Sequence, residues 1–272
     1  MRKAILFLSM LFAMVVRAEI GYYELVDSAD YYINKEEYAK AEETILRALR
    51  LEPSNYNNSL LLSNLGTIQR RQGRLEEAVK NYTFAIYMTP NAVTLLKNRA
   101  AVYVEMDSID HALSDYKKIV SLDKDDIESR YYCALIYLDK GRISEAQDII
   151  TELKDLDGKC AETQECLARM HQAMGHYTEA AGIFSQLLRD NSGRDDMLVH
   201  RAECYLGAND LQRAALDIEE CISLNPTDGY MYILKARLKK KLYLNNEVNE
   251  CISLAVKYGI PKSDAEMLLR VD

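Results

Sequence analysis

The sequence predicts an all-α fold, an α-solenoid of about seven helix-turn-helix repeats. One alanine returns at a constant interval, at Ala100, Ala134, Ala168 and Ala202. A second alanine follows each of these at a shorter constant spacing, at Ala112, Ala146, Ala180 and Ala214. A period of this length is typical of a solenoid, in which one supersecondary unit is stacked many times.

The paired alanines indicate two antiparallel helices in close contact, because helices approach closely only where one carries a small side chain. A large side chain follows the second alanine after four residues, on the same helix face. These large residues are Tyr116, Ile150, Phe184 and Ile218. A ring follows the first alanine after three residues, as Tyr103, Tyr137, His171 and Tyr205. The pattern therefore predicts one helical hairpin per period.

With these residues the sequence resembles the tetratricopeptide repeat family. When the first small residue is placed at position 8, the repeats begin at residues 22, 59, 93, 127, 161, 195 and 229. The family's proline at position 32 remains as Pro53, Pro90 and Pro226. The resemblance implies a right-handed superhelical α-solenoid over residues 19–272. It indicates function only weakly, because this fold has many unrelated binding roles.

Three places need individual explanation. The interval from Ala29 to Gly66 is longer than the others by three residues, which are inserted between the first two repeats. Glycines at the turns of three repeats are expected where a Cβ atom would be strained. They are Gly73, Gly141 and Gly175. At the other end, we expect residues 263–272 to form a capping helix that starts with a capping box at Ser263.

The segment 1–18 predicts a secretory signal peptide. Arg2 and Lys3 precede an apolar run, residues 4–16, and Ala18 ends a small-residue cleavage site. The run is shorter than the roughly 20 residues that span a membrane, so the mature chain is expected to have no transmembrane span. The alternative is an uncleaved anchor. We expect export, with a bacterial periplasm as the compartment.

The charge of the chain excludes nucleic-acid binding as a leading hypothesis. The segment 1–18 holds three of the 34 Lys and Arg and none of the 42 Asp and Glu, which leaves 31 against 42, a net charge of −11. Phosphate binding requires clustered positive charge. One basic run stands out in the last repeat: Lys235, Arg237, Lys239, Lys240 and Lys241. We interpret it as a solvated end face; the alternative is a site for an acidic partner or an anionic lipid surface.

No catalytic or cofactor motif occurs, so the sequence predicts neither an enzyme nor a cofactor. The six cysteines follow the repeat and not a disulfide framework, and free thiols are expected: Cys133, Cys160, Cys166, Cys204, Cys221 and Cys251. Cys166 and His200 share position 6 of successive repeats, which leaves a thiol- or metal-dependent enzyme as a remote alternative. A metal site needs three or four ligands, and only these two are aligned.

The leading hypothesis is a protein-binding scaffold or adaptor of the cell envelope that recognises a peptide or helix in its concave groove. The alternative is a structural subunit of an envelope complex that uses its outer face. Relatives that grip the C-terminal carboxylate of cytosolic chaperones carry cations around an asparagine. Asn64 and Asn98 hold that asparagine position, but Val26 and Glu128 stand where cations are required.

The predicted binding site lies in the groove of the third and fourth repeats, where inward positions become apolar. The apolar residues are Ala101, Val104, Tyr131, Leu135 and Leu138. The cations expected to border them are Arg70, Arg71, Lys97 and Arg169. These residues predict a ligand with an apolar anchor and acidic flanks. The alternative is that Tyr131 and Leu135 are buried against neighbouring helices.

Overall fold

The computed structural model describes residues 21–190 and 195–270, and within them all secondary structure is helical. The chain divides into two compact units, residues 1–122 and 123–272, and each is described by itself. The predicted fold class, an α-solenoid of helix-turn-helix repeats, is confirmed. The predicted signal peptide, residues 1–18, lies outside the described residues. One continuous solenoid over residues 19–272 stays a prediction.

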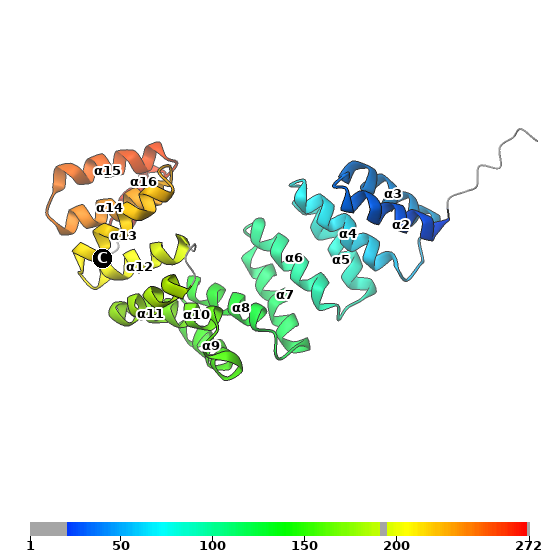
Figure 1. Cartoon of the computed structure of the whole chain (residues 1–272), viewed down its shortest axis with the longest axis horizontal. Coiled ribbons are helices and arrows are strands. Elements are labelled where there is room, and N and C mark those ends of the chain that lie inside the picture. The colour runs from blue at the N-terminus through cyan, green and yellow to red at the C-terminus, as the bar shows by residue number, and fades with distance from the viewer. Residues whose placement is uncertain (1–20, 191–194, 271–272) are drawn as a thin grey trace, which may run out of the picture. The chain divides into compact units, whose positions relative to one another are not determined.

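The first unit consists of three helical hairpins in chain order (Figure 1). Its helices are α2 (Tyr22–Asn34), α3 (Tyr38–Leu51), α4 (Asn58–Arg71), α5 (Leu75–Met88), α6 (Val93–Glu105) and α7 (Ile109–Leu122). Each odd-numbered helix packs on the first helix of its own hairpin, and α3 and α5 also contact the first helix of the next one. Stacked hairpins thus share one core, as the repeat pattern predicts.

The second unit consists of four hairpins and a short final helix. Its helices are α8 (Ile127–Asp139), α9 (Ile143–Asp157), α10 (Ala161–Ala173), α11 (Tyr177–Asp190), α12 (Asp195–Gly207), α13 (Leu211–Leu224), α14 (Gly229–Lys241), α15 (Asn245–Lys257) and α16 (Lys262–Leu268). First helices of neighbouring repeats contact each other, α8 with α10 and α12 with α14. We call the exposed side of the first helices the helix-A surface.

The small residues at positions 8 and 20 are packing residues, as predicted. Every alanine at these positions, from Ala29 to Ala236, has no exposed surface. In the second repeat Gly66 takes the place of alanine because a Cβ atom there would lie only 3.0 Å from the Tyr82 ring. The large residues four positions after the second alanine are also buried, with Phe184 and Ile218 at 0% exposure. These contacts set how closely the two helices of each hairpin approach.

All seven hairpin turns place position 15 in the left-handed backbone region. Gly73, Gly141 and Gly175 have φ between 67° and 78°, as expected. The same conformation occurs without glycine at Glu36, Asp107, Asn209 and Tyr243. Left-handed φ costs a residue with a side chain roughly 1 kcal/mol. The turn geometry is therefore imposed by helix packing, and the sequence relieves its strain at only three of the seven turns.

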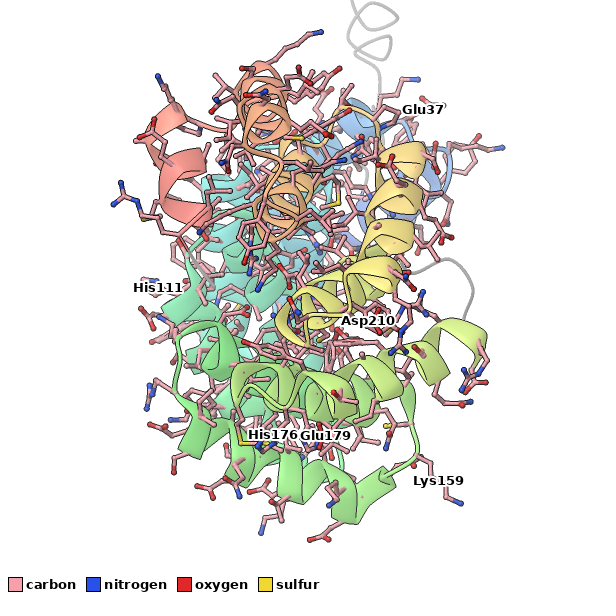
Figure 2. The ribbon with its side chains drawn as sticks, turned by 90° about the vertical axis from the view of Figure 1, so that its left-hand side faces the viewer. Glu37, His111, Lys159, His176, Glu179 and Asp210 are labelled. Carbon is pink, nitrogen blue, oxygen red and sulfur yellow. The ribbon has the colours of Figure 1, made fainter. Side chains whose placement is uncertain are left out.

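Aspartate side chains cap three described helices of the second unit. At α14 the Asp228 carboxylate accepts from the Tyr230 amide at 2.8 Å, and α13 and α8 are capped by Asp210 and Asp126. The Asp210 carboxylate, labelled in Figure 2, accepts hydrogen bonds from the Arg213 backbone amide at 3.2 Å and from the Arg213 Nε at 2.7 Å. These two bonds hold the pKa of Asp210 below its usual value. Asp126 caps α8 in a similar way, since its carboxylate accepts from the Ser129 amide at 2.7 Å. These side chains thus satisfy amides at a helix start that lack partners inside the helix.

The inserted residues after the first repeat form a turn held by Asn58. Its side chain is buried at 2% exposure and accepts a hydrogen bond from the Tyr22 hydroxyl at 2.9 Å. Its amide donates to the carbonyl oxygens of Glu52 at 2.8 Å and Pro53 at 3.1 Å. The helix begins at Asn58, one residue before the start predicted for this repeat, because this side chain closes the loop.

The C-terminal helix differs from its prediction. It begins at Lys262 with Pro261 at the N-cap, and Ser263 donates to the Asp264 carboxylate instead of capping. The fixed φ of proline is already suited to a helix start, so the helix begins directly after it. Ala265 and Leu268 pack on the end of the core, whereas Met267 is 62% exposed.

Two buried ion pairs, absent from the sequence predictions, occupy equivalent places in the third and sixth repeats. Arg99 donates to the Asp115 carboxylate through Nε at 2.8 Å and Nη2 at 2.6 Å. Arg201 binds Asp217 in the same way, at 2.8 Å for both bonds. The two aspartate side chains are only 6% and 7% exposed. Each bidentate pair joins the first helix of its repeat to the second.

Candidate protein-binding surface

The predicted site residues fall in both units. Arg70, Arg71, Lys97, Ala101 and Val104 belong to the first unit. The second unit holds Tyr131, Leu135, Leu138 and Arg169. Each group is described within its own unit, and a single site made by all of them stays a prediction.

Three of the four predicted cations already have partners within the chain. Arg70 Nε donates to the Glu105 carboxylate at 2.7 Å, and Arg169 Nη2 donates to the Asp139 carboxylate at 2.5 Å. Arg71 donates to the Tyr38 hydroxyl and lies over its ring. Carboxylates of the adjoining repeat therefore neutralise Arg70 and Arg169, whereas Arg71 has a neutral partner and keeps its exposed charge.

The predicted apolar residues differ in exposure. Val104 is 42% exposed, whereas Leu138 is only 8% exposed and belongs to the core. Ala101, Tyr131 and Leu135 are half-buried. The alternative predicted burial of Tyr131 and Leu135, but both are only half-buried; Leu138 is the residue that neighbouring side chains bury.

Tyr131 lines an open depression of about 550 Å³ on the helix-A surface of the second unit. Its walls come from α8 and α10: Ile127, Glu128, Tyr131, Tyr132 and Glu162. The two tyrosine rings meet edge to face, with centroids 5.2 Å apart. Glu128 and Glu162 are exposed carboxylates at its rim. We call this feature the tyrosine depression; it combines aromatic surface with negative charge.

A hydrogen-bond network around Glu203 joins three successive repeats on the same surface. The Glu203 carboxylate accepts hydrogen bonds from Gln172 Nε2 at 2.7 Å and from the Tyr230 hydroxyl, and His200 Nδ1 lies 3.3 Å away. Burial acts to raise the pKa of Glu203, but the hydrogen bonds from His200, Tyr230 and Gln172 outweigh it and hold this pKa below its usual value. Glu203 is thus a structural anion.

The structure does not join Cys166 and His200 into a reactive pair. Cys166 is fully buried, its Sγ lies 3.9 Å from the Tyr131 carbonyl oxygen, and burial strongly raises the pKa of its thiol. His200 stacks on Phe184 and contacts Glu203. A thiol with a raised pKa is a poor nucleophile and metal ligand. All six cysteines are free, as predicted, and five of them are buried.

The basic run in α14 is not a simple solvated face. Lys235 pairs with Glu219 and Lys239 with Glu247, both at 2.7 Å, and the two lysine side chains are only 26% and 22% exposed. Lys240 Nζ donates to the Leu269 carbonyl oxygen at 3.1 Å. These lysines therefore fasten α14 to α13, α15 and the residue after α16. The prediction of a solvated face is wrong for Lys235 and Lys239, because the carboxylates of Glu219 and Glu247 cover their charge, whereas Lys240 is exposed.

A family model of the tetratricopeptide repeat matches residues 26–93 and 167–228. These two segments contain tetratricopeptide repeats. A crystal structure of a tetratricopeptide repeat protein from Parabacteroides merdae is 29% identical with a TM-score of 0.75, and the match covers 92% of this chain and 97% of that one. The structure of the APC/C hetero-tetramer Cut9-Hcn1 shares the fold, with a TM-score of 0.68 at 12% identity over 95% of this chain and 57% of that one.

Curated relatives of this tetratricopeptide repeat chain are longer proteins. The Hsp70-Hsp90 organizing protein of Triticum aestivum is 25% identical over 71% of this chain and 40% of its own length. The U-box domain-containing protein 70 of Oryza sativa subsp. japonica is 22% identical over 64% of this chain and 26% of its own length. This chain thus spans less than half of each. Tetratricopeptide repeats are protein-interaction scaffolds and are generally non-catalytic.

Sequence reasoning missed several residues of this tetratricopeptide repeat surface. Tyr132, Glu128 and Glu162 line the tyrosine depression, but no periodic signal distinguishes them from other exposed residues. The ion pairs could have been found, because the third and sixth repeats each combine arginine at position 7 with aspartate at position 23. Within described residues, no helix is long and apolar enough to span a membrane.

Proposed function

We propose that this chain is a non-catalytic scaffold or adaptor of the cell envelope that binds a peptide or helix in a groove along its helix-A surface. The observation that carries the proposal is the tyrosine depression, because partly exposed tyrosines in a concave site are typical binding hot spots. A curated relative named for organizing Hsp70 and Hsp90 supports a role in bringing proteins together. The proposed ligand is a protein segment and not a nucleic acid.

The charge of the tyrosine depression suggests basic flanks on the ligand, in place of the acidic flanks inferred from sequence. Arg70 and Arg169 are paired with the carboxylates of Glu105 and Asp139, and Arg71 belongs to the other unit of the chain. The rim of the depression instead carries Glu128 and Glu162. A lysine or arginine of the partner can lie over a tyrosine ring and face these carboxylates.

Tyr131→Ala in combination with Leu135→Ala is expected to weaken ligand binding about tenfold or more, because Tyr131 lines the depression and Leu135 is half-buried one turn further along the same helix. A displayed peptide library is selected on residues 19–272, and the affinities of the enriched peptides are then measured. We expect peptides with an apolar residue beside lysine or arginine. Equal affinity for a folded double variant, or enrichment of acidic peptides, would contradict the site.

The outer surface of α5 favours the second candidate, a structural subunit that uses its outer face. Phe84, Tyr87 and Met88 are 61%, 84% and 37% exposed on neighbouring turns of this helix. Tyr87→Ala is therefore the matched control for Tyr131→Ala, since both remove one tyrosine ring. If Tyr87→Ala lowers the affinity and Tyr131→Ala does not, the outer surface is the binding face.

Export to the envelope is proposed from residues 1–18 alone. The expected mature chain begins near Glu19, because signal peptidase cleaves after small residues such as Ala18. Mass spectrometry of the protein from fractionated cells tests this. A mass that retains residues 1–18, found in the membrane fraction, would favour the uncleaved anchor.

A further inference from the structure

A second concave site lies on the helix-A surface of the second unit, apart from the tyrosine depression. It is a pocket of about 230 Å³ whose walls come from α10, α11, α12, α14 and α16. Tyr177, Ile233 and Leu268 supply its apolar walls, and Glu203, Tyr230 and Arg237 its polar groups. We call it the Arg237 pocket. Its volume suits one side chain of a partner rather than a small folded element.

The absence of a Cβ atom at Gly207 shapes this pocket. A Cβ atom there would lie 2.6 Å from the Tyr177 ring, well inside van der Waals contact. The ring of Tyr177 therefore rests directly on the backbone of α12. Any larger residue at 207 would displace this wall, which makes the pocket a defined feature of the packing.

Arg237 is the unusual group in this pocket. Its Nε is buried and finds no acceptor among the described residues. A guanidinium keeps its charge and has five donors, and a buried donor without a partner is destabilising. Arg169, at the same repeat position of the fifth repeat, has the Asp139 carboxylate as its partner. Among the described residues Arg237 thus has an unpaired Nε donor, and its side chain lines the pocket.

Glu203, the carboxylate already present in the pocket, does not accept a hydrogen bond from Arg237 Nε. Glu203 is occupied by Gln172, Tyr230 and His200, and its pKa lies below the usual value, so it stays ionised. Glu203 would repel a group with two negative charges about twice as strongly as a single carboxylate. A single carboxylate on an apolar stem matches the charge of Arg237 and the walls formed by Ile233 and Leu268.

We propose that the Arg237 pocket binds one glutamate or aspartate side chain of a protein partner, with the carboxylate accepting hydrogen bonds from the Arg237 guanidinium. Arg237 stands at position 9 of the last repeat, whereas the cation positions of the chaperone-binding arrangement that Val26 and Glu128 occupy here are positions 5 and 2. The site goes beyond the proposed function, because it selects an acidic residue at a place remote in sequence from Tyr131.

The test follows the Arg237 Nε–H signal by ¹⁵N NMR during titration of residues 19–272 with three capped tripeptides. They are Ac-Ala-Glu-Ala-NH₂, Ac-Ala-Gln-Ala-NH₂ and Ac-Ala-Ala-Leu-OH. We expect a saturable shift with the glutamate peptide and none with the isosteric glutamine peptide. In the variants, binding is followed through the backbone amide signals of the pocket residues, because Arg237→Gln has no Nε–H. Arg237→Gln should weaken binding of the glutamate peptide at least tenfold, whereas the control Arg169→Gln, on an arginine already paired, should not.

Each other outcome decides against the proposal. No shift of the Nε–H signal, or equal shifts with glutamate and glutamine, would overturn it. A stronger response to the free C-terminus of Ac-Ala-Ala-Leu-OH would assign the pocket to chain ends instead of acidic side chains. Arg237→Lys, which keeps the charge and the stem, is the second variant if Arg237→Gln fails to fold. Because Tyr131→Ala does not touch this pocket, failure of one site is distinguishable from failure of the other.

Discussion

Asp217→Ala is expected to lower the free energy of unfolding by about 3 kcal/mol, because it leaves the Arg201 guanidinium half-buried without its carboxylate. Arg201 is 20% exposed and Asp217 is 7% exposed, joined by two hydrogen bonds of 2.8 Å. The remaining partner, Ser185 Oγ at 3.4 Å, is uncharged and distant. Urea unfolding measures the loss, and hydrogen exchange should locate it in α12 and α13.

The control replaces both members of the pair with apolar residues of similar size. Arg201→Met with Asp217→Leu should lose much less stability than Asp217→Ala, because no buried charge is left alone. Asp115→Ala tests the equivalent pair of the first unit, where Arg99 also donates to Thr83 Oγ at 3.0 Å. A single-variant loss below about 1 kcal/mol, the range of exposed pairs, would show that these ion pairs do not stabilise the hairpins.

Ala146→Leu is expected to lower the free energy of unfolding by roughly 1–3 kcal/mol through overpacking. Ala146 in α9 has no exposed surface, and α9 packs on α8, where Ala134 is equally buried. Three extra heavy atoms must force the two helices apart or strain a side chain. Thermal unfolding of residues 19–272 measures the effect.

Gln147→Leu is the matched control for this prediction, because it places the same side chain on the same helix at an exposed position. It should change stability by less than about 0.5 kcal/mol. If the two variants melt at the same temperature, position 20 is not a close-packing position and the repeat register is wrong.

Residue type and spacing alone were enough to predict the helical hairpins and their core. A small side chain at positions 8 and 20 acts between the two helices of one hairpin, so its effect is local and repeats with the chain. Gly73, Gly141 and Gly175 were likewise predictable, since a left-handed turn favours glycine through its own backbone. Free thiols followed from the same periodicity, because the cysteines replace small apolar residues.

Only the tertiary structure decided whether each side chain of the helix-A surface is exposed, buried or paired with a neighbour. Leu138 and Val104 share one repeat position, yet one is 8% and the other 42% exposed. Arg169 has a carboxylate partner from the preceding repeat, whereas the Nε of Arg237, at the same repeat position, has none among the described residues. Such pairings join side chains of successive repeats, and long side chains can reach several neighbours. Periodicity therefore determined the scaffold, but the three-dimensional contacts between adjoining repeats decided which groups remain for a ligand.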